Sequence, residues 1–188
     1  MTHATYSVTS APSTEPLTLT QLKDRLRVTT TQFDDELEEL LTTARRQVEQ
    51  DTTRKLITQT VALYLDDFPA VETLEIRLSP ISAVVITYTD TAGETQTVAA
   101  TDYNLDPDST PPRVRVVDGV FWPAVDDVPN AVTVTITAGY GAAADVPAEA
   151  KLAIVEWCKL HWGQCDGDRT KYRNLIESLS WSAIGRAA

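Results

Sequence analysis

The sequence contains few of the residues from which disulfide frameworks and metal sites are built, with two cysteines and two histidines in 188 residues. Two cysteines are too few for a disulfide-stapled fold, so we expect Cys158 and Cys165 to be free, buried thiols. No apolar run approaches the roughly 20 residues that cross a bilayer. The polar segment 1–14 lacks the basic start and the apolar stretch of a signal peptide. These absences predict a protein made in the cytosol, with no membrane partner.

Basic residues are also scarce, and the net charge is -11 with a pI near 4.5. Proteins that wrap nucleic acid or bind anionic membranes need a Lys/Arg surface, so this composition argues against both functions. The charge is uneven, because residues 169–188 carry four basic side chains and one acidic one. This basic end predicts either a tail that docks on an acidic partner or a solvated terminus, and charge alone does not separate the two.

Residues 18–54 have helical periodicity and predict two helices. In the first, leucines recur three and four positions apart, and Thr18 or Thr20 can cap its start. The second opens with Thr31 and Asp34, a capping-box-like pair. Acidic residues crowd its first turns, where the helix dipole is positive. Its apolar residues form one stripe: Leu37, Leu40, Leu41, Ala44 and Val48.

Over residues 57–138 the apolar period changes to two, which is typical of half-buried strands. The best-patterned strand alternates Val132, Val134 and Ile136 with threonines. Strands at short spacing joined by tight turns indicate an antiparallel sheet, and not parallel strands joined by helices. The expected strands span residues 61–65, 74–78, 83–89, 94–98, 113–117 and 132–137.

A long helix near 147–163 is apolar around most of its circumference. Pro147 suits its first position and Gly163 its end. Such a helix must be buried on more than one side, within its own chain or partly against another copy. Its large apolar residues are therefore candidates for a subunit interface: Leu152, Val155, Trp157, Leu160 and Trp162. With a last helix over residues 171–179, the pattern predicts an α+β fold in which helices come first, then an antiparallel β region, then helices again.

No residue cluster makes a convincing catalytic or metal site. Cys158, His161 and Cys165 can share a helix face as zinc ligands would, but a fourth ligand is lacking and core positions explain them more simply. Three aspartates lack the spacing of a calcium loop, and turn chemistry accounts for them: Asp102, Asp106 and Asp108. The sequence therefore predicts neither a catalytic residue nor a cofactor.

A series of short segments follows a distinctive order over residues 16–162. They are Pro16-Leu17-Thr18-Leu19, Leu26-Arg27-Val28, Asp34-Asp35-Glu36-Leu37, Thr53 to Gln59, Leu65-Asp66-Asp67-Phe68-Pro69, Leu78 to Val84, Tyr88-Thr89-Asp90, Thr137 to Gly141 and Val146 to Lys151. In this order they resemble the head–tail connector (adaptor) family of long-tailed bacteriophages, prophages and gene transfer agents.

The resemblance implies an α+β fold, a small helical bundle with an inserted antiparallel β region. It also implies a structural virion protein without enzymatic activity. Twelve copies would form a ring beneath the portal protein and extend the DNA channel, and DNA would pass through the lumen without specific binding. The ring would also present the attachment surface for the next neck or tail protein. The protein would be made in the host bacterial cytoplasm and reside at the head–tail junction of the virion.

The pattern and the resemblance together divide the chain into three parts. We expect a flexible N-terminal arm (1–15), a connector domain (16–163) and a C-terminal docking tail (164–188). The connector domain comprises helices 18–54 and 147–163 and the β insertion 57–138. The tail matches the family least, and its candidates for portal docking are Arg169, Lys171, Tyr172, Arg173, Trp181 and Arg186.

Three other functions compete with the connector hypothesis. One is a neck or tail-completion protein located one ring further down. Another is a β-rich binding module that uses Trp122 or Tyr140. The third is a cysteine-dependent hydrolase that uses Cys158 and His161. Self-association separates the ring-forming classes from the last two, since a module or a hydrolase need not form rings.

Overall fold

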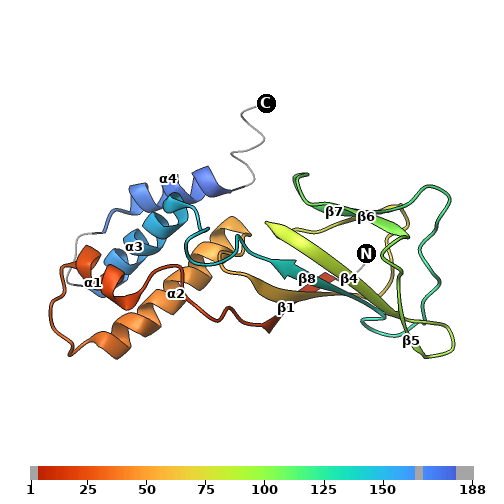
Figure 1. Cartoon of the computed structure of the whole chain (residues 1–188), viewed down its shortest axis with the longest axis horizontal. Helices are drawn as coiled ribbons and strands as arrows, with labels where there is room; N and C mark the ends of the chain where they lie inside the picture. Colours follow the sequence, from red (N-terminus) through yellow and green to blue (C-terminus); the bar gives the residue numbers. More distant parts are fainter. Residues whose placement is uncertain (1–3, 164–166, 181–188) are drawn as a thin grey trace. The chain divides into compact units, whose positions relative to one another are not determined.

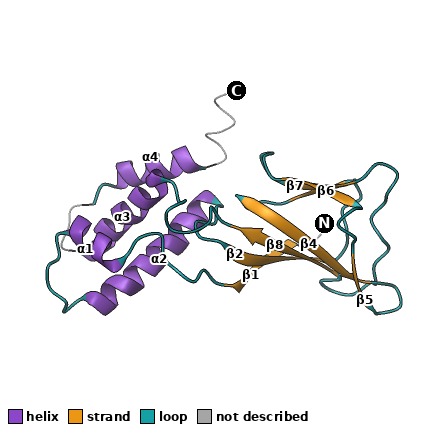
Figure 2. Ribbon diagram, in the orientation of Figure 1, coloured by secondary structure: helices purple, strands orange, loops and turns teal. Residues whose placement is uncertain are grey.

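The computed structural model describes residues 4–163 and 167–180, and the chain folds as two compact units. The β unit combines Met1–Ala11 with Thr58–Gly139, and the helical unit combines Pro12–Ile57 with Tyr140–Ala188. In sequence, the main part of the β unit is inserted between the second and third helices. The predicted α+β fold, with helices and antiparallel sheets, is confirmed (Figure 1, Figure 2).

The larger sheet of the β unit has the strand order β1-β2-β8-β4-β5, and all neighbouring strands are antiparallel. Alternation places one face of the inner strands in the core. Val61 and Leu63 of β2, for example, lie opposite Ile136 and Val134 of β8, and all four side chains are buried. The strands are β1 (Ala4–Ser10), β2 (Gln59–Leu65), β4 (Ile81–Thr89), β5 (Thr95–Thr97) and β8 (Val132–Ala138).

Residues 4–10 form an edge strand, which corrects the prediction of a flexible arm over residues 1–15. β1 pairs with β2 from Ala4, opposite Leu65, to Ser10. The hydroxyl of Tyr6 also accepts a hydrogen bond from the backbone N–H of Arg77 at 2.9 Å. The segment is rich in β-forming residues, but its partner strand is remote in sequence, so the local pattern does not reveal the pairing.

A second sheet in the β unit has the strand order β3-β7-β6. Its strands are β3 (Thr73–Glu75), β6 (Tyr103–Asp106) and β7 (Arg113–Val116). Strand β3 ends at Glu75 and is therefore shorter than the predicted strand 74–78. Its partner β7 begins directly after two prolines, which cannot donate hydrogen bonds to a neighbouring strand. Strand β6 was not predicted, since its Asn104 and Asp106 are residues typical of turns. Side chains of both sheets contribute to one apolar core.

The helical unit contains α1 (Leu19–Leu26), α2 (Asp34–Thr52), α3 (Ala148–Trp162) and α4 (Arg169–Leu179). The predicted helices 18–54, 147–163 and 171–179 are therefore present, with slightly different bounds. Their apolar faces form a single core in which Leu22, Leu37 and Ile154 are fully buried. Helix α3 ends at Gly163, whose backbone is left-handed with φ at 70°, a conformation that glycine adopts at low cost.

The starts of the first two helices differ in how they are capped. The Thr18 hydroxyl accepts the backbone N–H of Gln21, and the Gln21 side chain accepts that of Thr18, which makes a capping box. Helix α2 lacks the predicted cap at Thr31, because its N-cap residue is Phe33, with no side-chain cap bond. The Asp34 carboxylate pairs instead with a lysine of α1.

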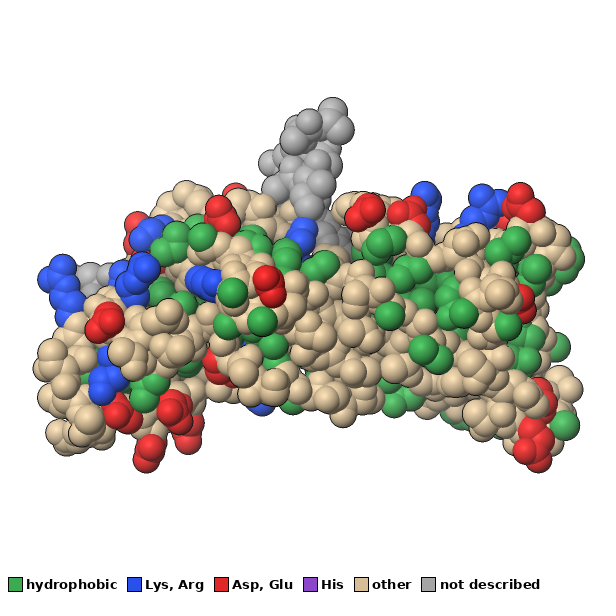
Figure 3. Space-filling view, viewed as in Figure 1, with side chains coloured by type: hydrophobic (Ala, Val, Ile, Leu, Met, Phe, Trp, Pro, Cys, Tyr) green, Lys and Arg blue, Asp and Glu red, His purple; other side chains and the backbone are tan. Residues whose placement is uncertain are grey.

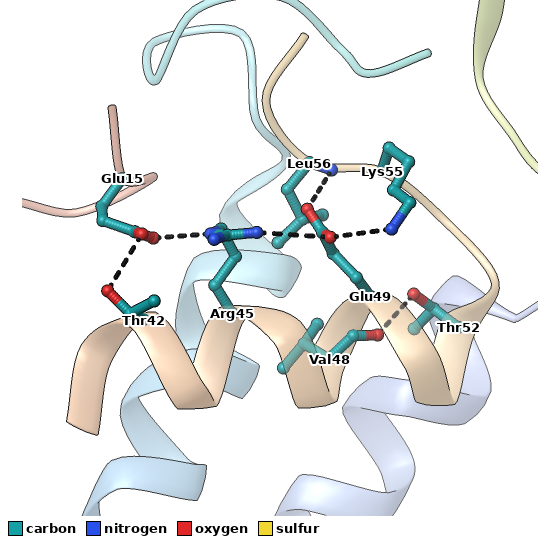
Figure 4. A network of polar contacts seen from close by, with 8 residues as sticks. All are labelled: Glu15, Thr42, Arg45, Val48, Glu49, Thr52, Lys55 and Leu56. Atoms are coloured by element: carbon teal, nitrogen blue, oxygen red, sulfur yellow. Dashed lines mark hydrogen bonds and ion pairs between the residues drawn. The ribbon is translucent and has the colours of Figure 1, made fainter. Parts of the chain in front are cut away.

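A buried ion network in the helical unit joins the segment before α1 to the segment after α2 (Figure 4). Arg45 donates to Glu15 at 2.8 Å, and its guanidinium lies 3.3 Å from the Glu49 carboxylate. Glu49 also pairs with Lys55 at 3.2 Å and accepts the backbone N–H of Leu56 at 3.1 Å. Both Arg45 and Glu49 are 5% exposed, so these charges are shielded from water and depend on one another.

Replacing Arg45 by methionine would remove the cation between two carboxylates and leave the buried Glu49 with fewer partners. We expect Arg45→Met to lower the free energy of unfolding by about 3 kcal/mol, measured by denaturant titration. The double variant Arg45→Met/Glu49→Met should regain part of this loss, because apolar side chains of similar volume replace both charges. A double variant less stable than Arg45→Met would contradict the account.

Candidate assembly surfaces

The cysteine and histidine of α3 are not arranged for nucleophilic catalysis. Cys158 is fully buried, and burial raises the pKa of its thiol to about 12, so the reactive thiolate does not form near neutral pH. The His161 ring stacks on Trp157 with centroids 3.8 Å apart, and its Nδ1 lies 2.8 Å from the Trp157 carbonyl oxygen. Cys165, the third residue of the candidate zinc set, lies outside the described residues.

Of the three aspartates whose spacing does not match a calcium loop, Asp106 has a clear role in the local fold. Asp106 forms an ion pair with Arg113 at 3.0 Å and accepts the backbone N–H of Ser109 at 3.2 Å. Within residues 4–163 and 167–180, no three acidic, histidine or cysteine side chains gather as a metal site requires. None of the helices in these same ranges is both long enough and apolar enough to cross a membrane.

The five interface candidates on α3 divide between the core and the surface of the helical unit. Val155 and Trp162 are buried, and the Trp162 ring packs edge-on against Phe33 with centroids 5.5 Å apart. The other three are only partly buried: Leu152, Trp157 and Leu160. The apolar circumference of α3 therefore mixes residues of its own core with residues that the chain leaves partly exposed.

A groove with partly apolar walls lies between α1 and α3. Its volume is about 500 Å³. The lining residues are Leu17, Gln21, Asp24, Arg25, Ala148, Lys151, Leu152 and Val155. Two of the interface candidates, Leu152 and Val155, thus belong to this groove. Neither Arg25 nor Lys151 has an ion-pair partner within the described part of the chain.

None of the residues of helix α4 is fully buried. The helix packs on the bundle through partly buried apolar side chains, and polar contacts around them hold it in place. The Tyr172 hydroxyl donates to Asp51 at 2.6 Å. Burial, and then this carboxylate, raise the pKa of Tyr172. Arg54, which follows α2, donates to the carbonyl oxygen of Leu179 at 2.6 Å. These contacts tie both ends of α4 to the α2 segment.

The buried carboxylate of Glu156 supplies a further attachment for α4. Glu156 is 2% exposed, and it pairs with Lys171 of α4 and with Lys159 at 3.3 Å. Burial alone would raise the pKa of Glu156, but hydrogen bonds from Lys171 and Lys159 outweigh it and lower the pKa. The charged form of Glu156 is therefore the one that fastens α4 to α3.

We expect Glu156→Gln to destabilise the protein by about 1–3 kcal/mol and to speed amide hydrogen exchange in α4. Because the folded pKa of Glu156 is lowered, its contribution is present above the ordinary carboxyl pKa and is lost as pH falls through the folded pKa. The stability difference from wild type should therefore shrink in acid. Glu149→Gln, at an exposed position of the same helix, is the control. A Glu156→Gln variant as stable as this control at pH 7 would refute the attachment.

The candidates for portal docking differ in whether their side chains already form contacts within the helical unit. Lys171 and Tyr172 are bound within the helical unit, as described above. Arg169 and Arg173 are exposed and form no ion pair within the described part of the chain. The last two candidates, Trp181 and Arg186, lie outside the described residues. Arg169 and Arg173 are thus the docking candidates whose charge the described fold leaves unpaired.

The β unit carries an exposed apolar pair, Phe121 and Val71, that the sequence pattern does not indicate. Phe121 is 80% exposed and Val71 is 64% exposed, and both line a hollow of about 750 Å³ beside two arginines of β7. The neighbouring Trp122 instead stacks on Phe68 in the core. The segment around these aromatics has no regular alternation, so the sequence does not indicate which of them is buried.

Solved structures share this fold over nearly the whole chain. A chain in the neck of an empty GTA particle, computed with C6 symmetry, matches with a TM-score of 0.77 and 23% identity over 94% of this chain and 95% of that one. A chain in the virion of a native gene transfer agent (GTA) particle matches with a TM-score of 0.78 and 23% identity, over 93% and 94%. A chain in the neck of a native GTA particle, computed with C12 symmetry, matches at 0.76 and 20%, over 94% of both.

No family model matches the sequence, and no curated protein matches it either. At these identities the structural likeness establishes the fold. The α+β arrangement described above, helical unit and β unit together, is one that occurs among the chains of gene transfer agent particles.

Proposed function

We propose that this chain is a structural subunit of the neck of a phage-like particle, and more closely a head–tail connector that forms a ring beneath the portal. The observation that carries the proposal is the fold match over 94% of the chain to a chain in a particle neck. The match covers both the helical unit and the β unit, so it does not rest on a common small motif.

The symmetry of the similar particles supports a ring of copies. Two of the matched chains come from necks computed with C6 and C12 symmetry. We propose the same type of assembly here, with twelve copies as the expected number. An acidic chain suits a channel wall, because like charge keeps DNA phosphates from adhering as they pass.

The proposed role is structural and needs neither catalysis nor a cofactor. The residues closest to a nucleophile and base, Cys158 and His161, are respectively buried with a raised thiol pKa and stacked on Trp157. A cysteine hydrolase would need an exposed thiol of lowered pKa beside the histidine. The environment of Cys158 therefore favours a core role.

The basic end of the chain is the proposed portal-docking surface. Arg169 and Arg173 on α4 offer two exposed cations, and the tail 164–188 also contains Trp181 and Arg186. Complementary charge would speed and orient docking on an acidic portal surface. The rest of the ring would receive the next neck or tail protein.

The test is binding of the purified full chain to its cognate portal ring, measured by mass photometry and imaging. Wild-type protein should add a ring of copies to the portal. Arg169→Glu/Arg173→Glu should weaken that binding about tenfold or more, since two charge contacts become repulsive. Arg46→Glu/Arg77→Glu is the control, because it changes the net charge equally at exposed arginines elsewhere.

Two results would overturn parts of this proposal. If both double variants bind like wild type, the docking surface is not on α4. If wild-type protein leaves the portal bare and binds an assembled neck or tail, the chain occupies a ring further down. That second result would support the neck or tail-completion alternative.

A further inference from the structure

The first turns of α2 carry more exposed acidic side chains than the helix itself needs. Asp34 is paired with a lysine of α1, but Asp35, Glu36, Glu38 and Glu39 are exposed and form no ion pair within the described part of the chain. Figure 3 shows acidic side chains grouped at the lower edge of the helical unit, where α2 begins. The helix dipole favours acids within the first turn only, so it does not account for Glu38 and Glu39.

The groove between α1 and α3 has complementary features. Its apolar wall includes Leu17 and Leu152, which are only partly buried. The unpaired cations Arg25 and Lys151 outnumber the single acid of the lining, Asp24. A groove of this kind is suited to a helix surface that combines apolar and acidic side chains.

The start of α2 is such a surface. Its core-facing residues, Leu37 and Leu41, are buried in their own chain. Leu40 remains partly exposed beside the unpaired acids Glu36 and Glu39. This part of α2 therefore offers one apolar side chain and several negative charges to a neighbour.

We propose that the groove between α1 and α3 of one copy receives the acidic first half of α2 from a second copy. This inference rests on the proposed function, in which copies of the chain form a ring. Because the groove and the acidic helix are different surfaces, the contact is heterologous and each copy uses both. Repeating a heterologous contact closes a ring when the rotation between copies allows it.

Charge reversal on one surface at a time tests the contact in the full-length protein. The acidic-surface variant is Glu36→Lys/Glu39→Lys, and the groove variant is Arg25→Glu/Lys151→Glu. A third variant combines all four changes and so restores opposite charges across the contact. The control for the acidic-surface variant is Glu75→Lys/Glu94→Lys, which makes the same change in net charge at exposed positions of the β unit.

Self-association is measured by sedimentation velocity over a concentration series, at low and at physiological salt. Wild type and the control should associate alike, and each single-surface variant should weaken association about tenfold or more. The four-residue variant should regain association to within about threefold of wild type. An equimolar mixture of the two single-surface variants should also associate, which unfolded variants would not do.

Association of the single-surface variants at the wild-type level would overturn the contact and point to another occupant of the groove, such as a neck protein. So would a wild-type chain that stays monomeric up to roughly 1 mM, a concentration at which a contact of even millimolar affinity is half formed. Neither result affects recruitment by the portal, which tests the proposed function separately. A chain that fails both tests would refute the ring itself.

Discussion

The structure of the helical unit depends on a buried charge network around Arg45 and Glu49. These two side chains join the chain that enters α1 to the chain that leaves α2. The chain returns from the β segment to this same part of the helical unit, where the backbone N–H of Tyr140 donates to the carbonyl oxygen of Leu56 at 3.2 Å. An insertion of about eighty residues between two helices is thus compatible with one bundle core, since its two ends are fixed together. Burying charges is costly, and this role in fixing the chain ends offers a reason for the cost.

Local patterns predicted most of the helical unit. The leucine spacing in α1, the apolar stripe of α2 and the glycine after α3 are properties of neighbouring residues, and the structure contains each of them. The cap of α2 was predicted wrongly, because the Asp34 carboxylate is engaged by a lysine of α1. That contact depends on how two helices pack, which a capping pattern does not include.

Long-range pairing accounts for most of what the sequence did not predict. Strand β1 pairs with a strand remote in sequence, and β6 consists of residues typical of turns. For the candidate surfaces, the sequence predicted the regions but not which of their side chains are exposed. Composition indicated a basic end and an apolar α3. Only packing separates the buried Val155 and Trp162 of α3 from Leu152, which the chain leaves partly exposed. In the β unit, packing likewise leaves Phe121 largely exposed. Whether a side chain is available to a partner is decided by tertiary contacts.

We propose that this chain forms the ring directly beneath the portal. The most direct measurement is a cryo-electron microscopy reconstruction of the neck of the particle that carries this protein. We expect density for a closed ring of this α+β fold in contact with the portal, with α4 at that contact. A neck in which a different protein touches the portal, and this fold lies in another ring or is missing, would contradict it.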